Sequence, residues 1–216
     1  MNNRQRRRSF APWYRNLSAP TRLYLFRHGK VDKVRFPGLY GQLDATLSEE
    51  GVRQSHNAAA RLADVRLDAV YASDLERAVY LARLIADEHN LPLETFPEFR
   101  ERHFGEWQNK TWDEIETECP DLMRQYQNDY ATFVVPGGEN FLTVQQRILG
   151  RLDQVLERHQ HGVIALAAHA GCNRVIIADA LGLELEKIFN IWQDPACMNI
   201  IDYYDDGRAV LRMAGS

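Results

Sequence analysis

The sequence predicts an α/β fold in which a mostly parallel central sheet lies between two layers of helices. Short apolar runs alternate with helical patterns along the chain, and this order is typical of parallel strands joined by crossover helices. Near the C-terminus, Asp205-Asp206-Gly207 separates two further strand-like runs and predicts a hairpin at one edge of the sheet. The chain has 216 residues, 45% of them hydrophobic and 26% charged, which fits a globular protein with one sizeable core.

The strands are predicted from short apolar runs, each of which begins and ends next to polar or turn-forming residues. In order, these runs cover residues 23–26, 68–72, 93–96, 163–168, 200–204 and 209–213. The helices are predicted from wider apolar spacing and from start signals, such as Ser48-Glu49-Glu50 before the first of them. They cover residues 48–64, 73–89, 111–118, 120–131, 140–159 and 171–181. Ser73 and Glu76 form a capping-box pattern, which predicts Ser73 as the N-cap of its helix.

The chain divides into a short basic head and a long acidic body. Residues 1–22 hold six arginines and no acidic residue, so the remainder carries 20 basic against 30 acidic residues. We interpret residues 1–20 as a solvated tail, the alternatives being a nucleic-acid arm or an organelle-targeting segment. We expect residues 21–216 to form a single domain. Within it, the polar stretch at about 107–136 is predicted to be an insertion that lies over the carboxyl ends of the strands as a partial lid.

Composition also limits the compartment and the partners. An acidic body argues against a nucleic-acid partner, and no apolar run is long enough to span a membrane. The three cysteines are odd in number, lie far apart and form no C-x-x-C pair, which argues against a disulfide framework and a thiolate metal site. We therefore expect a cytoplasmic protein. The sequence gives no prediction of its oligomeric state.

Polar side chains follow three of the predicted strands. Arg27 and His28 follow the first, the segment that contains Arg77 follows the second, and His169 follows the fourth. Ligands of open α/β sheets bind outside the carboxyl ends of the strands, so these side chains are expected to converge on one crevice. Two plainer readings stay open: a histidine at a strand end that serves only as a hydrogen-bonding group, and a surface pairing of Arg77 with Asp74 or Glu76.

Two arginines and two histidines in one crevice suit a phosphate group. The planar fork of an arginine matches phosphate oxygens two at a time, and the free N–H groups of a helix that begins near Gly171 would also favour an anion. His28 is the candidate nucleophile, because a neutral imidazole can attack phosphorus. Gly29 would let the backbone turn tightly behind it.

A set of motifs, in order along the chain, resembles that of the histidine phosphatase superfamily, the phosphoglycerate-mutase-like proteins. The resemblance runs from about residue 21 to residue 204 and is nearest to the α-ribazole phosphatase type. The motifs are Leu25-Phe26-Arg27-His28-Gly29, the segment 41–51, Tyr71-Ala72-Ser73-Asp74-Leu75-Glu76-Arg77-Ala78, the segment 100–107, and Pro136-Gly137-Gly138-Glu139 with Ala168-His169-Ala170-Gly171.

The resemblance implies a three-layer α/β/α fold and a role for each site residue. His28 would take the phosphoryl group, and Arg27, Arg77 and His169 would hold its oxygens. Glu101 would protonate the leaving oxygen and then activate water; the residues alone do not favour it over Glu98, Glu106 or Glu139. We find no metal site or cofactor motif and expect neither, because the arginines would neutralise the charge.

The chain departs from the family pattern just after the first motif. Lys30, Val31 and Val34 occupy positions at which the family often has polar residues, so two pocket contacts are missing or come from elsewhere. The leading function is a phosphomonoester hydrolase acting on a small phosphorylated metabolite, with α-ribazole 5′-phosphate as the candidate. The alternatives are a phosphoglycerate mutase and a non-catalytic phospho-ligand-binding protein. The acidic composition of residues 107–136 disfavours a strongly anionic substrate.

Overall fold

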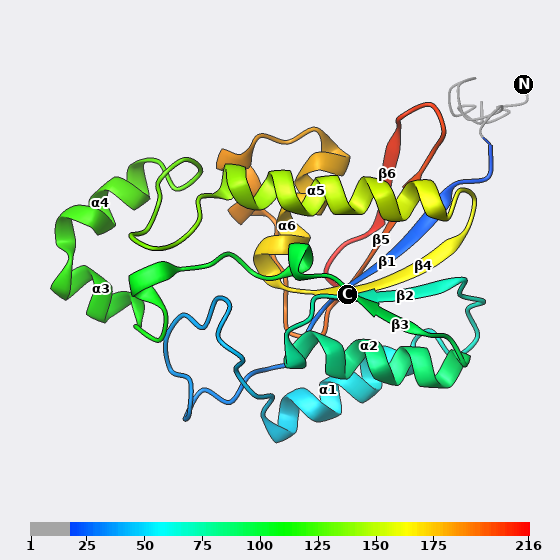
Figure 1. The fold of residues 1–216 in the computed structure, drawn as a ribbon, viewed down its shortest axis with the longest axis horizontal. Coiled ribbons are helices and arrows are strands. Elements are labelled where there is room, and N and C mark those ends of the chain that lie inside the picture. Colours follow the sequence, from blue (N-terminus) through cyan, green and yellow to red (C-terminus); the bar gives the residue numbers. More distant parts are fainter. Residues whose placement is uncertain (1–17) are drawn as a thin grey trace, which may run out of the picture.

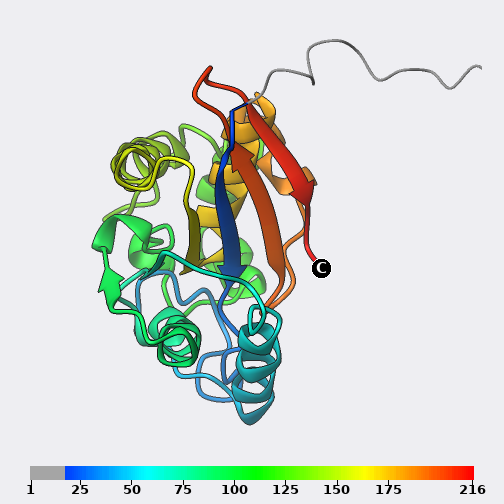
Figure 2. The same cartoon turned by 90° about the vertical axis from the view of Figure 1, so that its right-hand side faces the viewer.

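The computed structural model describes residues 18–216, so the interpretation of the arginine-rich head falls almost entirely outside the described residues. Six strands form one sheet in the order β3-β2-β4-β1-β5-β6, in which β1 to β4 are parallel and β5 and β6 form an antiparallel hairpin at one edge (Figures 1 and 2). The predicted mostly parallel sheet with a terminal hairpin is confirmed. The strands are β1 (Thr21–Arg27), β2 (Ala69–Ala72), β3 (Leu93–Thr95), β4 (Val163–Ala168), β5 (Met198–Tyr203) and β6 (Ala209–Met213).

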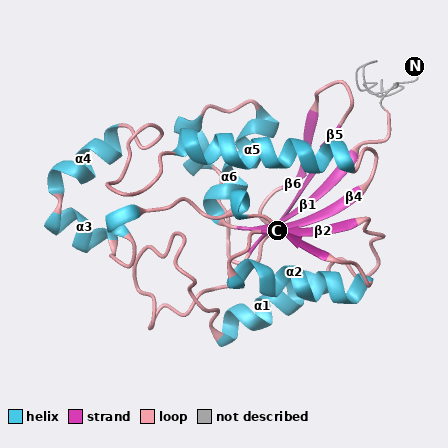
Figure 3. Ribbon diagram, viewed as in Figure 1, coloured by secondary structure: helices cyan, strands magenta, loops and turns pink. Residues whose placement is uncertain are grey.

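The helices lie on both faces of this sheet. Figure 3 shows the helix of residues 141–158 on one side of the strands and the helices of residues 49–60 and 76–89 on the other. The α-helices are α1 (Glu49–Ala60), α2 (Glu76–His89), α3 (Trp112–Glu118), α4 (Pro120–Asn128), α5 (Phe141–Arg158) and α6 (Ala170–Leu181). Short 3₁₀ helices complete the described part, among them η4 (Leu185–Asn190), which the sequence analysis did not predict. No helix within residues 18–216 is both long and apolar enough to cross a membrane.

Alternation along β1 builds the two halves of the core. Leu23 and Leu25 pack with the apolar faces of α5 and α6, whereas Tyr24 and Phe26 pack with those of α1 and α2. Successive strand side chains point to opposite faces of a sheet, so a strand covered on both faces reads as a continuous apolar run. This explains why residues 23–26 are apolar throughout.

The strands β1, β2 and β4, each followed by polar residues, are neighbours in the sheet, and their carboxyl ends lie at the same edge of it. In the register of the sheet, Arg27 at the end of β1 pairs with Ala168 of β4, and Ala72 at the end of β2 pairs with Ala167. The sheet order β2-β4-β1 therefore places the residues that follow these strands side by side, as the sequence predicts.

The predicted capping box at the start of α2 is wrong. The helix begins at Glu76 and its N-cap is Leu75, which makes no side-chain capping bond. The Ser73 hydroxyl lies 2.8 Å from Nε2 of His169 and also accepts a hydrogen bond from the Leu75 N–H. Ser73 thus contacts His169, which lies 96 positions away in the sequence, instead of capping the helix. The local sequence does not reveal such a partner.

The segment 107–136 extends beyond the carboxyl ends of the strands, with α3 and α4 at the left of Figure 1. It packs around a small apolar cluster of its own, formed by Trp107, Ile115, Met123 and Val135. A role as a partial lid stays a prediction.

Candidate active site

His28 follows β1 directly and is only 2% exposed. Its Nδ1 lies 2.7 Å from the carbonyl oxygen of Gly29. Because a carbonyl oxygen can only accept, Nδ1 carries the proton and donates it, and Nε2 keeps its lone pair. Burial, and after it the charges of Arg77 and Arg27, lowers the pKa of His28 well below its usual value. The ring is therefore neutral at neutral pH, with a basic nitrogen available to an electrophile.

Gly29 is required for a reason other than the tight turn that its motif predicts. A Cβ atom at this position would lie 2.2 Å from the carbonyl oxygen of Gly51, in the first turn of α1. The absence of a side chain lets α1 approach the backbone immediately after His28. This packing fixes the segment whose carbonyl group orients the imidazole.

His169 follows β4 and is fully buried beside His28, with the two ring centroids 5.2 Å apart. Its Nε2 is bonded to the Ser73 hydroxyl, while its Nδ1 is buried and has no hydrogen-bond partner within residues 18–216. Burial, and after it the charges of Arg77 and His28, lowers the pKa of His169 well below its usual value. Two neutral imidazoles therefore lie against each other among arginines.

Arg77 is 1% exposed and is held by the backbone rather than by an acid. Its two terminal amino groups donate to the carbonyl oxygens of Leu43, at 2.7 Å, and Gly41, at 2.6 Å. Asp74 pairs with Arg100 instead. The surface-pairing alternative for Arg77 is therefore wrong, and its positive charge stays available to a ligand.

Three buried polar atoms in this cluster lack a hydrogen-bond partner in the part of the chain that the structure describes: Nε of Arg27, Nε of Arg77 and Nδ1 of His169. Leaving such an atom unpaired costs about 1–3 kcal/mol, so buried polar atoms are normally bonded. Two of the three are donors on permanent cations, and the group that would satisfy them is an anion. The four predicted residues thus lie together, and their unpaired donors make this cluster a candidate anion site.

Glu101 lies beside this anion site at the N-terminus of α6. Its two carboxylate oxygens accept hydrogen bonds from the backbone N–H of Arg102, at 2.9 Å, and of Gly171, at 3.0 Å. A Cβ atom at Gly171 would lie 2.2 Å from Oε1 of Glu101, so a side chain there would displace the carboxylate from this position. Glu101 therefore occupies the Gly171 N–H, and an anion bound by the other N–H groups at the start of α6 stays a prediction.

The other candidate acids have different surroundings. Glu98 pairs with Arg151 and Glu139 pairs with Arg147, while Glu106 is exposed. Of the four acids that the sequence could not separate, Glu101 alone lines the cavity next to the anion site.

Arg147, near the middle of α5, holds the segment that carries Glu101. Its guanidinium donates to the carbonyl oxygens of Glu98, Arg100 and Glu101, and makes two further bonds to the carboxylate of Glu139. These five bonds connect α5 to the loop of the candidate acid. Sequence analysis missed this role, because Arg147 lies in an ordinary helical stretch with no motif around it.

A cavity of about 270 Å³ adjoins Glu101, between the loop of residues 33–41 and the segment 107–136. The sequence analysis missed two cations that line it, Lys33 and Arg174. Arg174 lies in the helix that follows His169, and no motif around it marks it as a site residue. Six lining residues are aromatic: Tyr40, Phe104, Trp112, Tyr126, Phe141 and Phe189.

The acids of residues 107–136 do not line this cavity. Glu118 pairs with Lys110, Asp121 pairs with Arg124, and Glu114 caps α3. These acids would therefore not contact a ligand in the cavity, and the inference from them about the charge of the substrate stays a prediction.

The three residues that depart from the family pattern also lie outside the cavity. Lys30 pairs with Glu50 at 2.6 Å, Val31 is buried, and Val34 is 96% exposed. Lys33 is the residue of this loop that lines the cavity, and burial, and after it the charge of Arg27, lowers its pKa.

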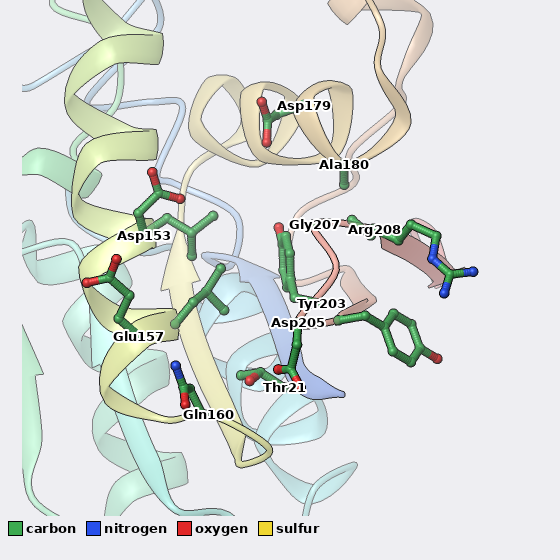
Figure 4. Close-up of a pocket in the computed structure, with 14 residues that line it drawn as sticks. Thr21, Asp153, Glu157, Gln160, Asp179, Ala180, Tyr203, Asp205, Gly207 and Arg208 are labelled. Carbon is green, nitrogen blue, oxygen red and sulfur yellow. The ribbon is translucent and has the colours of Figure 1, made fainter. Parts of the chain in front are cut away.

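A second cavity, of about 350 Å³, lies at the opposite end of the strands (Figure 4). It is lined by the start of β1, the C-terminal halves of α5 and α6, and the turn of the β5–β6 hairpin. Burial, and after it the charge of Asp153, raises the pKa of Asp179 here. Four acids line it, which makes it unsuited to a phosphate group: Asp153, Glu157, Asp179 and Asp205.

Comparison with known proteins gives relatives along nearly the whole chain. The chain is 30% identical over 182 residues to the adenosylcobalamin/α-ribazole phosphatase of Escherichia coli strain K12, covering 84% of this chain and 89% of that protein. It is 27% identical over 192 residues to phosphoserine phosphatase 1 of Hydrogenobacter thermophilus, covering 89% and 91% respectively. The crystal structure of the α-ribazole phosphatase from Shigella flexneri superposes with a TM-score of 0.81 at 31% identity, covering 91% of this chain and 96% of that one.

The family model for the histidine phosphatase superfamily, branch 1, matches residues 23–215. That range includes both histidines and both arginines of the anion site, together with Glu101. The fold is that of the phosphoglycerate-mutase-like phosphatases, which confirms the expected three-layer architecture. By sequence, by fold and by the site that the strands assemble, the chain belongs to the histidine phosphatase superfamily, branch 1, as an enzyme of the phosphatase type.

Proposed function

We propose that this phosphatase hydrolyses a phosphomonoester of a small metabolite through a phosphohistidine at His28. The observation that carries the proposal is the bond from Nδ1–H of His28 to the Gly29 carbonyl, because it leaves Nε2 unprotonated in an anion site. Arg27, Arg77 and His169 bind the phosphoryl oxygens and stabilise the charge of the transition state. These side chains neutralise the phosphoryl group, so the proposed reaction uses no metal or other cofactor.

In the first half-reaction, Nε2 of His28 attacks phosphorus. The N–P bond forms while the P–O bond to the leaving group breaks, and the leaving oxygen takes the proton of the Glu101 carboxyl group. Such general acid assistance is worth about 10²–10⁴-fold. The Gly29 carbonyl keeps its bond to Nδ1–H throughout, and this bond stabilises the positive charge that the ring acquires.

In the second half-reaction, the Glu101 carboxylate takes a proton from water as the water oxygen attacks phosphorus. The N–P bond breaks and inorganic phosphate leaves. His28 regains its lone pair on Nε2 with the proton still on Nδ1, and Glu101 is again protonated. The enzyme thus returns to its starting state without exchanging a proton with any further group.

The candidate substrate is α-ribazole 5′-phosphate, and the compound to test against it is phosphoserine. Relatives named as α-ribazole phosphatases support the first, and a relative named as a phosphoserine phosphatase supports the second. A cytoplasmic location is part of the proposal. It is supported by the three free cysteines, Cys119, Cys172 and Cys197, which suit a reducing compartment.

Trapping the phosphoenzyme tests this mechanism. His28→Ala should abolish both phosphate release and labelling of the protein, whereas His56→Ala, at an exposed histidine of α1, should leave both unchanged. The label should be lost in acid and kept in alkali, as expected of a phosphoramidate. An alkali-labile label would move the nucleophile to a carboxylate. Interconversion of 2- and 3-phosphoglycerate without phosphate release would favour the mutase instead.

A further inference from the structure

An aromatic wall lines the cavity beside Glu101: Trp112, Tyr126, Phe141 and Phe189. Trp112 and Tyr126 are stacked, with centroids 5.6 Å apart and ring planes 21° apart. Tyr126 lies 6.3 Å from Tyr130, and Tyr130 lies 4.8 Å from Phe189. Because each ring packs against the next, the wall is held in place before any ligand binds.

Two rings at the ends of this wall are exposed. Trp112 of α3 is 42% exposed and Phe189 of η4 is 43% exposed. They come from segments far apart in the sequence, and they meet at a cavity that also contains the carboxylate of Glu101. The group that covers these rings is therefore the part of the substrate that Glu101 is proposed to protonate, namely the leaving group.

The polar groups of the cavity favour a ligand that carries hydrogen-bond acceptors. Arg174 donates through Nε to the carbonyl oxygen of Ile191, and its terminal amino groups have no partner among residues 18–216. Its guanidinium lies 5.3 Å from the centroid of the Phe189 ring. Glu101 is the one carboxylate among the lining residues, and it is already bonded to two backbone N–H groups. A leaving group with hydroxyl or ring-nitrogen acceptors would satisfy Arg174.

We propose that Trp112 and Phe189 stack on a planar ring of the leaving group, so that this enzyme selects nucleotide-like phosphate esters over ringless ones. The inference rests on the proposed function and narrows its substrate class. The cavity, at about 270 Å³, lies just below the range of about 300–1,000 Å³ typical of drug-sized ligands. It therefore suits one ring system and a short polar linker.

A matched pair of esters tests the ring. Adenosine 5′-monophosphate and ribose 5-phosphate release the same kind of primary oxygen, so the chemical step makes the same demand in both. Stacking on an aromatic side chain is worth about 1–3 kcal/mol per base, which corresponds to about 5- to 150-fold. Trp112→Ala should therefore lower kcat/KM for the nucleotide by that factor and leave ribose 5-phosphate nearly unchanged.

The matched control is Trp192→Ala, which removes a tryptophan that is 72% exposed and lies outside the cavity. This substitution should leave kcat/KM unchanged for both esters. Phe189→Ala provides a second variant that removes the other end of the wall. If Trp112→Ala does not fold, Phe189→Ala alone should show the same selective loss for the nucleotide.

Three outcomes separate failure of the inference from failure of the proposed function. Equal losses for both esters would mean that the rings only support the fold. A higher kcat/KM for 3-phosphoglycerate, which is anionic and ringless, than for adenosine 5′-monophosphate would mean that the cavity selects substrates by charge, through Lys33 and Arg174. If neither these esters nor α-ribazole 5′-phosphate and phosphoserine are hydrolysed, the proposed function fails. Calorimetry of adenosine 5′-monophosphate and ribose 5-phosphate with His28→Ala protein, with and without Trp112→Ala, then still tests stacking.

Discussion

Glu101 is distinguished from nearby acids by the groups that bind it. Its oxygens accept two backbone N–H bonds, whereas Glu98 and Glu139 are paired with arginines. The Arg151 hydrogen bond lowers the pKa of Glu98, and the bonds from Arg147 lower the pKa of Glu139 although burial opposes them. Both arginine-paired acids are thereby held as carboxylates. Glu101 is the acid that has both access to the cavity and no competing arginine pair.

Glu101→Gln should slow poor leaving groups much more than good ones. The leaving group of an alkyl ester is a basic alkoxide that needs the proton, so kcat/KM for such an ester should fall about 10²–10⁴-fold, or roughly 3–5 kcal/mol. The leaving group of a nitrophenyl ester is a stable anion, so kcat/KM for that ester should fall far less. The comparison uses kcat/KM, which reports the steps up to the phosphoenzyme. Glu98→Gln is the control, and equal losses for both esters in Glu101→Gln would rule out its role as the acid.

At the level of secondary-structure elements, α5 supports the site through Arg147. The five bonds of its guanidinium satisfy three carbonyl oxygens of the Glu101 loop and the Glu139 carboxylate, which is only 18% exposed. Gln42 adds a bond to the Glu101 carbonyl and another to Glu139. The position of the candidate acid thus depends on a helix that supplies no group to the phosphate.

Arg147→Met should damage stability and catalysis together. Removing one partner of a largely buried ion pair lowers the free energy of unfolding by about 3–5 kcal/mol, and here three carbonyl oxygens also lose their hydrogen bonds. Urea unfolding should show this lower free energy of unfolding. The kcat/KM for alkyl esters should fall at least tenfold, because the Glu101 loop loses its anchor. Arg151→Met, one turn further along α5, removes the pair with Glu98 and the contacts with Gln154 and the Phe96 ring, but no bond to a carbonyl oxygen of the Glu101 loop, and is the matched control. Similar kcat/KM values in the two variants would refute the positioning role.

The strand ends could be predicted from the sequence because each signal is local. An apolar run followed directly by Arg27 and His28, or by His169, places those residues without knowledge of distant contacts. Glu101 could not be chosen in this way, because its surroundings come from Gly171 and, through Arg147, from α5. The capping box failed for the same reason.

At the scale of the whole molecule, two buried neutral histidines make folding depend on pH. In the unfolded chain a histidine titrates near pH 6.5. In the folded protein, burial and neighbouring arginines hold the pKa values of His28 and His169 well below that. Below about pH 6.5 the unfolded state therefore binds more protons, and the free energy of unfolding falls as pH falls. Above that pH the two histidines have no such effect.

The expected slope is at most about 2.7 kcal/mol per pH unit for the pair, or about 1.4 for each histidine. Urea unfolding at pH values from about 7.5 down to 5 should show a steep loss of stability in the wild type. His28→Ala should show a shallower loss over the same range. The buffer must be free of phosphate, which would stabilise the folded state by binding. Parallel curves for the two proteins would mean that His28 is not held neutral by the fold.

The acidic cavity of Figure 4 and the arginine-lined site lie at opposite ends of the same strands. Arginines therefore gather near the N-terminus of α6 and acids near its C-terminus, an arrangement that follows the direction of the helix dipole. A phosphate ester that approaches in solution is attracted to one end and repelled from the other, so productive encounters are favoured by long-range steering. This force is screened beyond about 8 Å at physiological ionic strength. Added salt should therefore slow capture of the substrate, measured as kcat/KM, and leave kcat nearly constant.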